Sequence, residues 1–337
     1  MLRRVYKITI TLVILISMYA GCTYEPDSLG DFEKIYVFAD SSLFDRVRTN
    51  LEQVFDNYVY TPHAEKSFYL ELHPFEDLSA YERRRNLLFL IILDKEDAVS
   101  RYIQNALSPE VENAIREERI FEIFQENFYA REQMIIILPA VNVEKLRQSL
   151  EAYKERIYQK LEAYNFKRME KIMFLRGEQK TLEEYLTENL GWYIRIQHDY
   201  SIVKETDDSN FIWFRRFKPD RNLFVYRFRA DTLPEGDEWL IQLRDSLAVI
   251  YFESDRIDRE DTYMVRTTFQ NRPAVTMIGV WQNDRHLLGG PFKTFAFYDS
   301  ENKLIYILDI SVTAPGERKK PFMDQLEVMA KTFRFTS

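Results

Sequence analysis

Four strand-like segments follow one another near the end of the chain. They are Tyr263–Phe269, Ala274–Trp281, Phe292–Tyr298 and Leu304–Val312. The last two are separated only by the turn Asp299–Lys303, and consecutive strands joined in this way pair in an antiparallel sheet. The chain then closes with a helical pattern whose apolar side is formed by Phe322, Leu326, Met329 and Phe333. Strands bounded by helices predict an α+β architecture, with helices packed on the sheet.

More strands precede this run. A short helix over Leu182–Leu190 ends at Gly191, and an amphipathic helix lies around Trp239–Ile250. Between the two helices the sequence offers four strand candidates: Trp192–Gln197, Tyr200–Glu205, Phe211–Phe217 and Leu223–Arg229. The interval Arg176–Lys180 is polar and contains Gly177, so we place a domain boundary there. We therefore expect a C-terminal α+β domain over residues 181–337.

The preceding segment, residues 32–175, predicts an N-terminal α+β domain. Ile35–Phe38 has the pattern of a strand, and Ser42 with Asp45 three residues on predicts the start of a helix. Leu87–Leu93 is continuously apolar, which is typical of a strand buried on both faces. A long helix begins near Val143, with an apolar stripe of Leu146, Leu150, Tyr153, Ile157, Leu161 and Tyr164. We interpret this stripe as a seam facing the core, not as a partner-binding coiled coil.

The N-terminus has the features of an export signal. Met1–Lys7 carries three basic residues and no acid, Ile8–Met18 is largely apolar, and small residues precede Cys22. The apolar run is shorter than the ~20 residues that a membrane-spanning helix needs. Residues 1–21 are therefore predicted to be a signal peptide. Tyr19-Ala20-Gly21-Cys22 is similar to the lipobox of bacterial lipoproteins, although Tyr19 stands where an aliphatic residue is usual.

The resemblance to lipoproteins implies that Cys22 carries a diacylglycerol thioether and fatty acyl chains such as palmitate, and becomes the first residue of the mature protein. Cys22 is the only cysteine, so the mature chain has no disulfide. Residues 22–31 are polar and predict a short coil tether. They reach at most about 30 Å at ~3.5 Å per residue, so the first domain is expected close to the bilayer. No aspartate follows Cys22 directly, which favours the outer membrane; the periplasmic or surface face stays open.

The charge of the chain bears on its partners. The formal net charge is −8, and removal of Arg3, Arg4 and Lys7 with the signal peptide leaves −11. Such a surface repels phosphate backbones, so nucleic acid is an unfavourable partner. The densest basic cluster, Arg83-Arg84-Arg85, precedes an apolar strand and is interpreted as a solvated turn. An envelope protein or glycan, and the membrane itself through Cys22, are the expected partners.

The usual catalytic and cofactor motifs are absent from the sequence. The four histidines, His63, His73, His198 and His286, have no metal-ligand spacing, and the glycines form no phosphate-binding loop. No Gly-x-Ser-x-Gly sequence marks a nucleophile. We therefore predict no metal site, no cofactor and no catalytic residue.

The most unusual local stretch is Gly279–Phe292, with the sequence GVWQNDRHLLGGPF. One interpretation is a binding loop, with Trp281 as an aromatic face and polar contacts from its neighbours. Its members would be Trp281, Asp284, Arg285, His286, Gly289 and Gly290. The other interpretation, which we favour, is a hairpin whose turn needs positive φ at Gly289 or Gly290.

A second candidate pair lies on the amphipathic helix. Arg244 and Asp245 form either an ionic site or a surface or edge pair. Exposed pairs contribute little to stability, so the surface interpretation needs no further cause and is preferred.

Several phrases of the second half occur together with the lipoprotein signal. They are Asn210-Phe211-Ile212-Trp213, Arg244-Asp245, Thr262-Tyr263-Met264, Gly279-Val280-Trp281, Gly289-Gly290-Pro291-Phe292 and Ala314-Pro315. In these the chain resembles an uncharacterised bacterial lipoprotein family, domain of unknown function four-eight-three-seven. The resemblance runs from the signal to the C-terminus, is more distinct after residue 190, and implies no activity. The order of elements in this half is also similar to the extrinsic-subunit fold of photosystem II, an analogy of fold only.

Two functions are compatible with these patterns. The first is a membrane-anchored envelope lipoprotein of unknown biochemical activity that binds or scaffolds another envelope component and is not an enzyme. The second is a membrane-tethered hydrolase acting on envelope glycan or peptide, with carboxylates such as Asp284 or Asp299 for acid–base chemistry. Two carboxylates within about 10 Å in one cleft would support the second.

Overall fold

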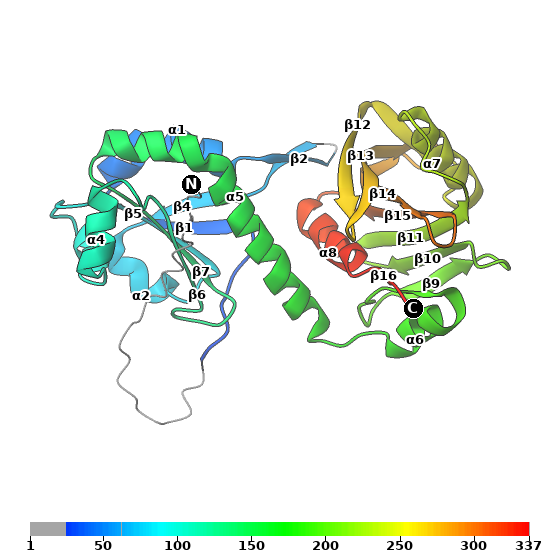
Figure 1. Cartoon of the computed structure of the whole chain (residues 1–337), viewed down its shortest axis with the longest axis horizontal. Helices are drawn as coiled ribbons and strands as arrows, with labels where there is room; N and C mark the ends of the chain where they lie inside the picture. The colour runs from blue at the N-terminus through cyan, green and yellow to red at the C-terminus, as the bar shows by residue number, and fades with distance from the viewer. Residues whose placement is uncertain (1–24, 62, 337) are drawn as a thin grey trace, which may run out of the picture.

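The computed structural model describes residues 25–61 and 63–336. The predicted signal peptide and Cys22 lie outside the described residues. Figure 1 shows two sheet-containing halves, with the long helix α5 (Val143–Phe174) running from the first half toward the second. Both halves mix sheets and helices, and the predicted α+β class is confirmed.

The first half contains a five-stranded sheet in the order β4-β1-β5-β7-β6. Its strands are β1 (Lys34–Phe38), β4 (Tyr69–His73), β5 (Asn86–Ile92), β6 (Ile123–Glu126) and β7 (Met134–Ala140). All neighbours are parallel except β6 and β7. Every residue of β5 is buried, as the continuous apolar run predicts.

Helices cover both faces of this sheet, which gives a three-layer arrangement. On one face α1 (Ser41–Phe55) and α5 pack on β1, β5 and β7. The other face is covered by α2 (Leu78–Tyr81), α3 (Ala98–Gln104) and α4 (Pro109–Arg116), with the short 3-10 helix Phe75–Asp77 beside them. Ser108 accepts a hydrogen bond from the Val111 amide and caps the start of α4.

Two local predictions in this half were wrong. The N-cap residue of α1 is Asp40, not Ser42. The Asp40 carboxylate accepts hydrogen bonds from the Leu43 amide and from the Ser42 hydroxyl. In α5, Tyr153 does not face the core: it is 37% exposed and stacks on Phe121, with ring centres 3.5 Å apart. Leu150 and Ile157, its neighbours in the apolar stripe, are buried in the core of the first half, so Tyr153 alone among these three packs on a partner outside the core.

The segment that the sequence predicts as a coil tether is docked on the first half. Ser28 is buried, its amide donates to the Arg131 carbonyl at 2.9 Å, and its hydroxyl donates to the Glu132 carbonyl. Arg85 donates from Nε to the Gly30 carbonyl at 2.6 Å. The basic triplet is therefore not simply a solvated turn, because its backbone and side chains hold residues 27–30 in place.

The second half contains a seven-stranded antiparallel sheet in the order β12-β13-β14-β15-β11-β10-β9. The strands are β9 (Ser201–Glu205), β10 (Phe211–Arg216), β11 (Asp220–Arg229), β12 (Arg256–Phe269), β13 (Arg272–Asn283), β14 (Leu288–Asp299) and β15 (Leu304–Thr313). The predicted strand Trp192–Gln197 is shorter: β8 (Trp192–Tyr193) pairs only with β16 (Arg334–Phe335).

Helices cover both faces of this sheet as well. On one face lie α6 (Lys180–Leu190), α8 (Lys320–Lys331) and the C-terminal turns of α5. The other face is covered by α7 (Glu238–Tyr251) through Leu240 and Leu247. Gly191 ends α6 in the left-handed conformation, at φ 73°, as predicted. Ile250, predicted on the apolar side of α7, is 66% exposed.

The two halves touch through a hairpin and a helix end. The hairpin of β2 (Tyr58–Thr61) and β3 (His63–Lys66) reaches from the first half to β13 and β14 of the second. On this hairpin the Glu65 carboxylate accepts hydrogen bonds from the amides of Lys319 (2.9 and 3.1 Å) and Lys320 (3.0 Å) at the start of α8. A carboxylate at a helix N-terminus is favourable, so Glu65 joins the two halves as a cap supplied across the junction.

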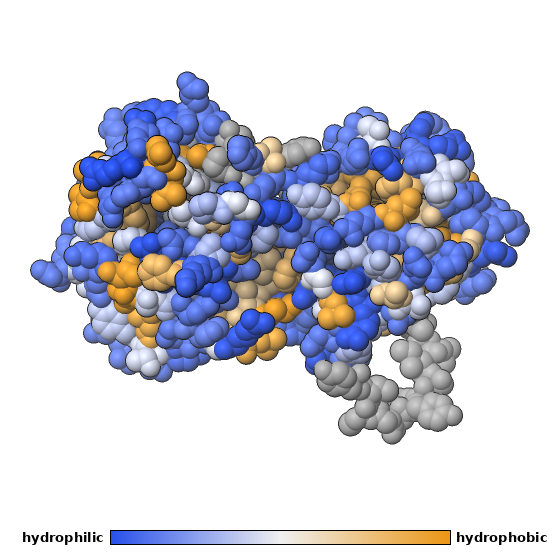
Figure 2. Space-filling view, turned by 180° about the vertical axis from the view of Figure 1, so that it is seen from behind, coloured by the Kyte–Doolittle hydropathy of each residue, from blue (hydrophilic) through white to orange (hydrophobic). Residues whose placement is uncertain are grey.

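The surface is mostly hydrophilic. Figure 2 shows this from behind, with hydrophobic residues gathered in a few patches over both halves. In the described part of the chain, no helix is both long enough and apolar enough to span a bilayer.

Candidate functional site

The loop singled out in the sequence is a structural hairpin between β13 and β14. Trp281 is only 5% exposed and packs in the core under α7, so its interpretation as an exposed aromatic face was wrong. The amides of Arg285 and His286 both donate to the Asn283 side chain at 3.0 Å. His286 Nε2 lies 2.5 Å from a Glu253 carboxylate oxygen.

The expected positive φ at Gly289 or Gly290 was also wrong. Both glycines belong to β14, and the turn residue with positive φ is Leu287, at 51°. The glycines are needed for space. A Cβ on Gly290 would lie 1.9 Å from the Val312 carbonyl oxygen, and one on Gly289 would lie 2.9 Å from the Trp281 carbonyl oxygen. Close strand approach, not turn conformation, therefore explains this Gly-Gly pair.

Arg244 and Asp245 do not form a surface or edge pair. Arg244 is a buried residue of α7, and its Nε donates to Asp309 of β15 at 2.8 Å. The Thr294 hydroxyl donates to the same carboxylate. Asp245 instead accepts the Ile257 amide at 2.9 Å. Burial raises the pKa of Asp309, although the Arg244 guanidinium acts in the opposite direction. This buried ion pair fixes α7 on the sheet.

The two carboxylates considered for hydrolysis lie at opposite ends of β14. Asp284 is exposed beside Arg256 in the turn before the strand, and Asp299 is buried at its last residue, where it accepts from Asn302. A strand of 12 residues spans about 40 Å at ~3.4 Å per residue. The two groups therefore cannot share one cleft, and paired acid–base chemistry between them is excluded.

A polar cavity lies where the two halves meet, and we call it the junction pocket. Its volume is about 450 Å³. Its walls are Phe166, Lys167 and Glu170 of α5, Tyr193 and Arg195 after α6, Gln270 of the β12–β13 turn, and Val328 and Lys331–Arg334 at the end of α8. Segments far apart in sequence thus converge on one site.

Cations dominate the lining of the junction pocket. Four basic side chains, Lys167, Arg195, Lys331 and Arg334, stand against the single carboxylate of Glu170. Lys167 and Arg334 are exposed, and neither forms an ion pair with a carboxylate of the described residues. A local excess of positive charge on a chain of net charge −8 marks the pocket as favourable for an anion.

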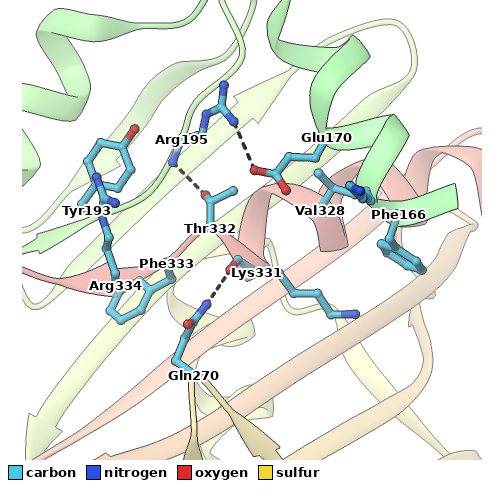
Figure 3. Close-up of a pocket in the computed structure, with 11 residues that line it drawn as sticks. Phe166, Glu170, Tyr193, Arg195, Gln270, Val328, Lys331, Thr332, Phe333 and Arg334 are labelled. Atoms are coloured by element: carbon cyan, nitrogen blue, oxygen red, sulfur yellow. Dashed lines mark hydrogen bonds and ion pairs between the residues drawn. The ribbon is translucent and has the colours of Figure 1, made fainter. Parts of the chain in front are cut away.

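Arg195 is held in a fixed position at the upper wall (Figure 3). It donates to both carboxylate oxygens of Glu178 at 2.9 and 3.0 Å and to Glu170 at 3.1 Å. The hydrogen bonds from Arg195 lower the pKa of Glu178 to about 2. Its backbone amide also donates to the Thr332 hydroxyl at 2.8 Å, which ties the wall to the end of α8.

Aromatic rings support two of the other three cations, Arg334 and Lys331. The Arg334 guanidinium lies 4.2 Å from the centre of the Tyr193 ring, and Lys331 Nζ lies 4.3 Å from the centre of the Phe166 ring. Lys331 also pairs with Glu327 at 2.8 Å. The pocket therefore combines oriented positive charge with flat apolar faces, the composition expected of a site for a small anionic group on a larger molecule.

A neighbouring cavity of about 560 Å³ shares Lys167, Glu170 and Arg195 with the junction pocket. There the added residues include Glu126 and Glu132, so positive and negative side chains are balanced. Among the described residues no group of three or more His, Cys, Asp or Glu side chains is placed to hold a metal ion. The sequence offered no signal for the junction pocket, because its residues belong to no motif.

The architecture is thus that of a two-part α+β protein with a cationic pocket at the junction. Residues 179–332 match the family described as Domain of unknown function (DUF4837). This confirms the family predicted for the second half. A different family, Domain of unknown function (DUF8532), matches residues 28–174, so the resemblance to DUF4837 does not extend over the first half.

Comparison with solved structures gives distant likenesses. The chain resembles the cyanobacterial PsbP protein (CyanoP) of Synechocystis sp. PCC 6803 at 7% identity and TM-score 0.31, over 43% of this chain and 86% of that one. It resembles LpqN of Mycobacterium tuberculosis, described as involved in cell envelope biogenesis, at 12% identity and TM-score 0.29, over 44% and 87%.

A third likeness is to the Ran-binding protein Mog1p of Saccharomyces cerevisiae, at 8% identity and TM-score 0.30, over 44% of this chain and 91% of that one. TM-scores this low carry no argument about the fold, so we assign the fold class from the sheets and helices described above. No curated protein matches this chain.

Proposed function

We propose that this protein is a lipid-anchored binding module of the bacterial cell envelope that holds an anionic envelope component in the junction pocket. The observation that carries the proposal is the lining of that pocket, where four cations face one carboxylate. The two cations without an acidic partner among the described residues, Lys167 and Arg334, are the groups available to a ligand.

The shape and chemistry of the pocket favour a carboxylate or phosphate on a glycan or peptide. Its volume of about 450 Å³ lies within the ~300–1,000 Å³ of small-ligand sites. An anion there gains charge-assisted hydrogen bonds from Lys167 and Arg334. Tyr193 and Phe166 add flat surfaces on which a sugar ring or an apolar side chain can rest.

Attachment to the membrane is proposed through Cys22, with the outer membrane as the favoured location. Residues 27–30 are docked on the first half, so little free chain separates the anchor from the folded domain. Four residues, from Cys22 to Pro26, reach at most about 14 Å at ~3.5 Å per residue. The first half would therefore lie close to the bilayer, with the junction pocket beyond it.

Charge reversal tests the binding proposal. Full-length protein carrying a proximity label would be expressed in native membranes as wild type and as the double variant Lys167→Glu/Arg334→Glu. We expect the double variant to lose the labelled envelope components, because both free cations become anions. Lys154→Glu, an exposed charge reversal on α5 that does not line the pocket, is the matched control. An unchanged set of labelled components in the double variant would refute the junction pocket as the site.

The anchor is tested separately. Mass spectrometry of the mature N-terminus should show an acylated Cys22, and density-gradient separation of membranes should place the protein with the outer membrane. A Cys22→Ala variant should lose membrane attachment. An intact Met1, or cleavage at another residue, would refute lipidation without bearing on ligand binding by the pocket.

A further inference from the structure

A third, largely apolar cavity lies in the first half. Its volume is about 310 Å³, and it shares no lining residue with the junction pocket. It lies between the sheet and the α3–α4 layer, and its inner wall includes Phe89, Ile103, Val111, Ile123, Ile135 and Ile137. The cavity opens to the surface, because Tyr102 and Phe128 of its lining are exposed, so a largely apolar space of this size is accessible to a ligand.

The rim of this cavity is polar and aromatic. The hydroxyl oxygens of Tyr102 and Tyr129 lie 2.5 Å apart, and the Gln125 amide is also part of the lining. Phe128, packed edge-on against Tyr129 at 4.6 Å, is 50% exposed at the opening. Tyrosine hydroxyls and an amide thus provide hydrogen-bonding groups in a largely apolar space.

We infer that this cavity binds a fatty acyl chain. A cavity of ~150 Å³ lined by aliphatic residues holds a benzene, so about 310 Å³ has room for roughly twice that apolar volume. The one carboxylate in the wall, Glu122, lies 2.7 Å from Arg156, but its buried oxygens accept no well-aligned hydrogen bond, and burial raises its pKa although Arg156 acts in the opposite direction. An acyl chain would occupy the apolar interior, and its carboxyl or ester oxygen would accept a hydrogen bond from Tyr102 or Tyr129 at the rim.

The start of the described chain lies close to this rim. The Arg131 amide donates to the Pro26 carbonyl at 2.8 Å, and Arg131 follows Tyr129 by two residues. Acyl chains on Cys22, four residues before Pro26, would be within reach of the opening. This source of the chain rests on the proposed lipidation; a lipid of the surrounding membrane is the other source and does not depend on it.

Photo-cross-linking in cells tests the inference on the full-length protein. The cells are fed palmitic acid that carries a diazirine and an alkyne, irradiated, and the purified protein is digested and analysed by mass spectrometry. We expect cross-links concentrated in peptides spanning residues 102–137. Ala106→Trp and Leu107→Trp, both at lining positions, should reduce them about tenfold, the effect of ~1.4 kcal/mol of lost affinity. Ala163→Trp, at an exposed position of α5 outside the cavity, should not.

The cross-linked masses identify the source. A link between the Cys22 peptide and residues 102–137 indicates the protein's own anchor, and a phospholipid mass on the same peptides indicates a membrane lipid, including in Cys22→Ala. Failure of lipidation removes only the first of these signals. In the wild type, cross-links that avoid residues 102–137 would overturn the inference. The inference would also be overturned if both tryptophan variants unfolded thermally like the wild type and were labelled at residues 102–137 as strongly as the wild type.

Discussion

Replacement of Arg168 by methionine should lower the free energy of unfolding by about 3 kcal/mol. Arg168 on α5 is fully buried, and no carboxylate of the described residues forms an ion pair with it. Its guanidinium donates to the carbonyls of Arg85 (3.0 Å) and Glu132 (3.2 Å), and to the side-chain oxygens of Asn86 and Asn165. Burial lowers the pKa of Arg168 to about 9, so the side chain remains charged at neutral pH.

The expected magnitude follows from the acceptors that Arg168 would leave. The Arg85 and Glu132 carbonyls keep another donor each, the Met134 amide and the Ser28 hydroxyl. The two asparagine oxygens would lose the guanidinium, and each buried unsatisfied group costs about 1–3 kcal/mol. The methionine variant no longer buries a cation, and the desolvation free energy thereby saved offsets part of this loss. The expected net decrease in the free energy of unfolding is about 3 kcal/mol. Arg168→Lys should lie between wild type and Arg168→Met, because it keeps the charge but not the planar fork.

Urea unfolding followed by circular dichroism measures this effect. A loss of about 3 kcal/mol corresponds to a drop in Tm of roughly 6–12 °C. Arg229→Met, which removes an exposed arginine of β11, is the control and should change stability by less than about 0.5 kcal/mol. If the free energy of unfolding of Arg168→Met were within 1 kcal/mol of the wild-type value, the hydrogen bonds of the buried guanidinium would not be what holds α5 against the amino ends of the strands.

Three further substitutions test other contacts. The pKa of Glu178 is lowered to about 2, so its ion pair stabilises the fold above pH 4.5, and that contribution is lost as pH falls toward 2. Between these pH values the free energy of unfolding of Glu178→Gln, measured in urea, should therefore fall by about 1–2 kcal/mol less than that of the wild type. Gly290→Ala should cost about 1–3 kcal/mol, measured by thermal unfolding, because its Cβ meets the Val312 carbonyl; wild-type stability would contradict this. Glu65→Ala should cost about 0.5–2 kcal/mol as a lost helix cap and increase proteolysis between the halves, and unchanged cleavage would argue against the cap.

The second sheet was predictable because its strands pair locally. The segments from Tyr263 to Val312 become β12, β13, β14 and β15 in sequence order, since short turns fix each pairing. The position of β11 beside β15 could not be predicted, because α7 and three strands separate them in sequence. The same holds for the first sheet, where β1 lies between β4 and β5: parallel pairing is non-local and leaves no signal in neighbouring residues.

The candidate site was harder to predict than the fold. Trp281 alternates along β13 like any strand residue, and nothing local shows that α7 covers it. The buried partner of Arg244, Asp309, lies 65 residues further along the chain. The junction pocket draws its cations from positions between Lys167 and Arg334, each unremarkable in its own segment. Only tertiary placement turns these scattered charges into a concentrated positive site.

Because the walls of the junction pocket come from both halves, their relative position determines its shape. Lys167 belongs to α5, whereas Arg334 belongs to β16 of the second half. The contacts that hold the halves together include the Glu65 cap on α8, and α8 ends at Lys331 in the pocket wall. Loss of this cap should therefore weaken ligand binding although Glu65 does not line the pocket. A Glu65→Ala variant that is looser between the halves yet binds its envelope component as wild type does would show that the pocket keeps its shape without this contact.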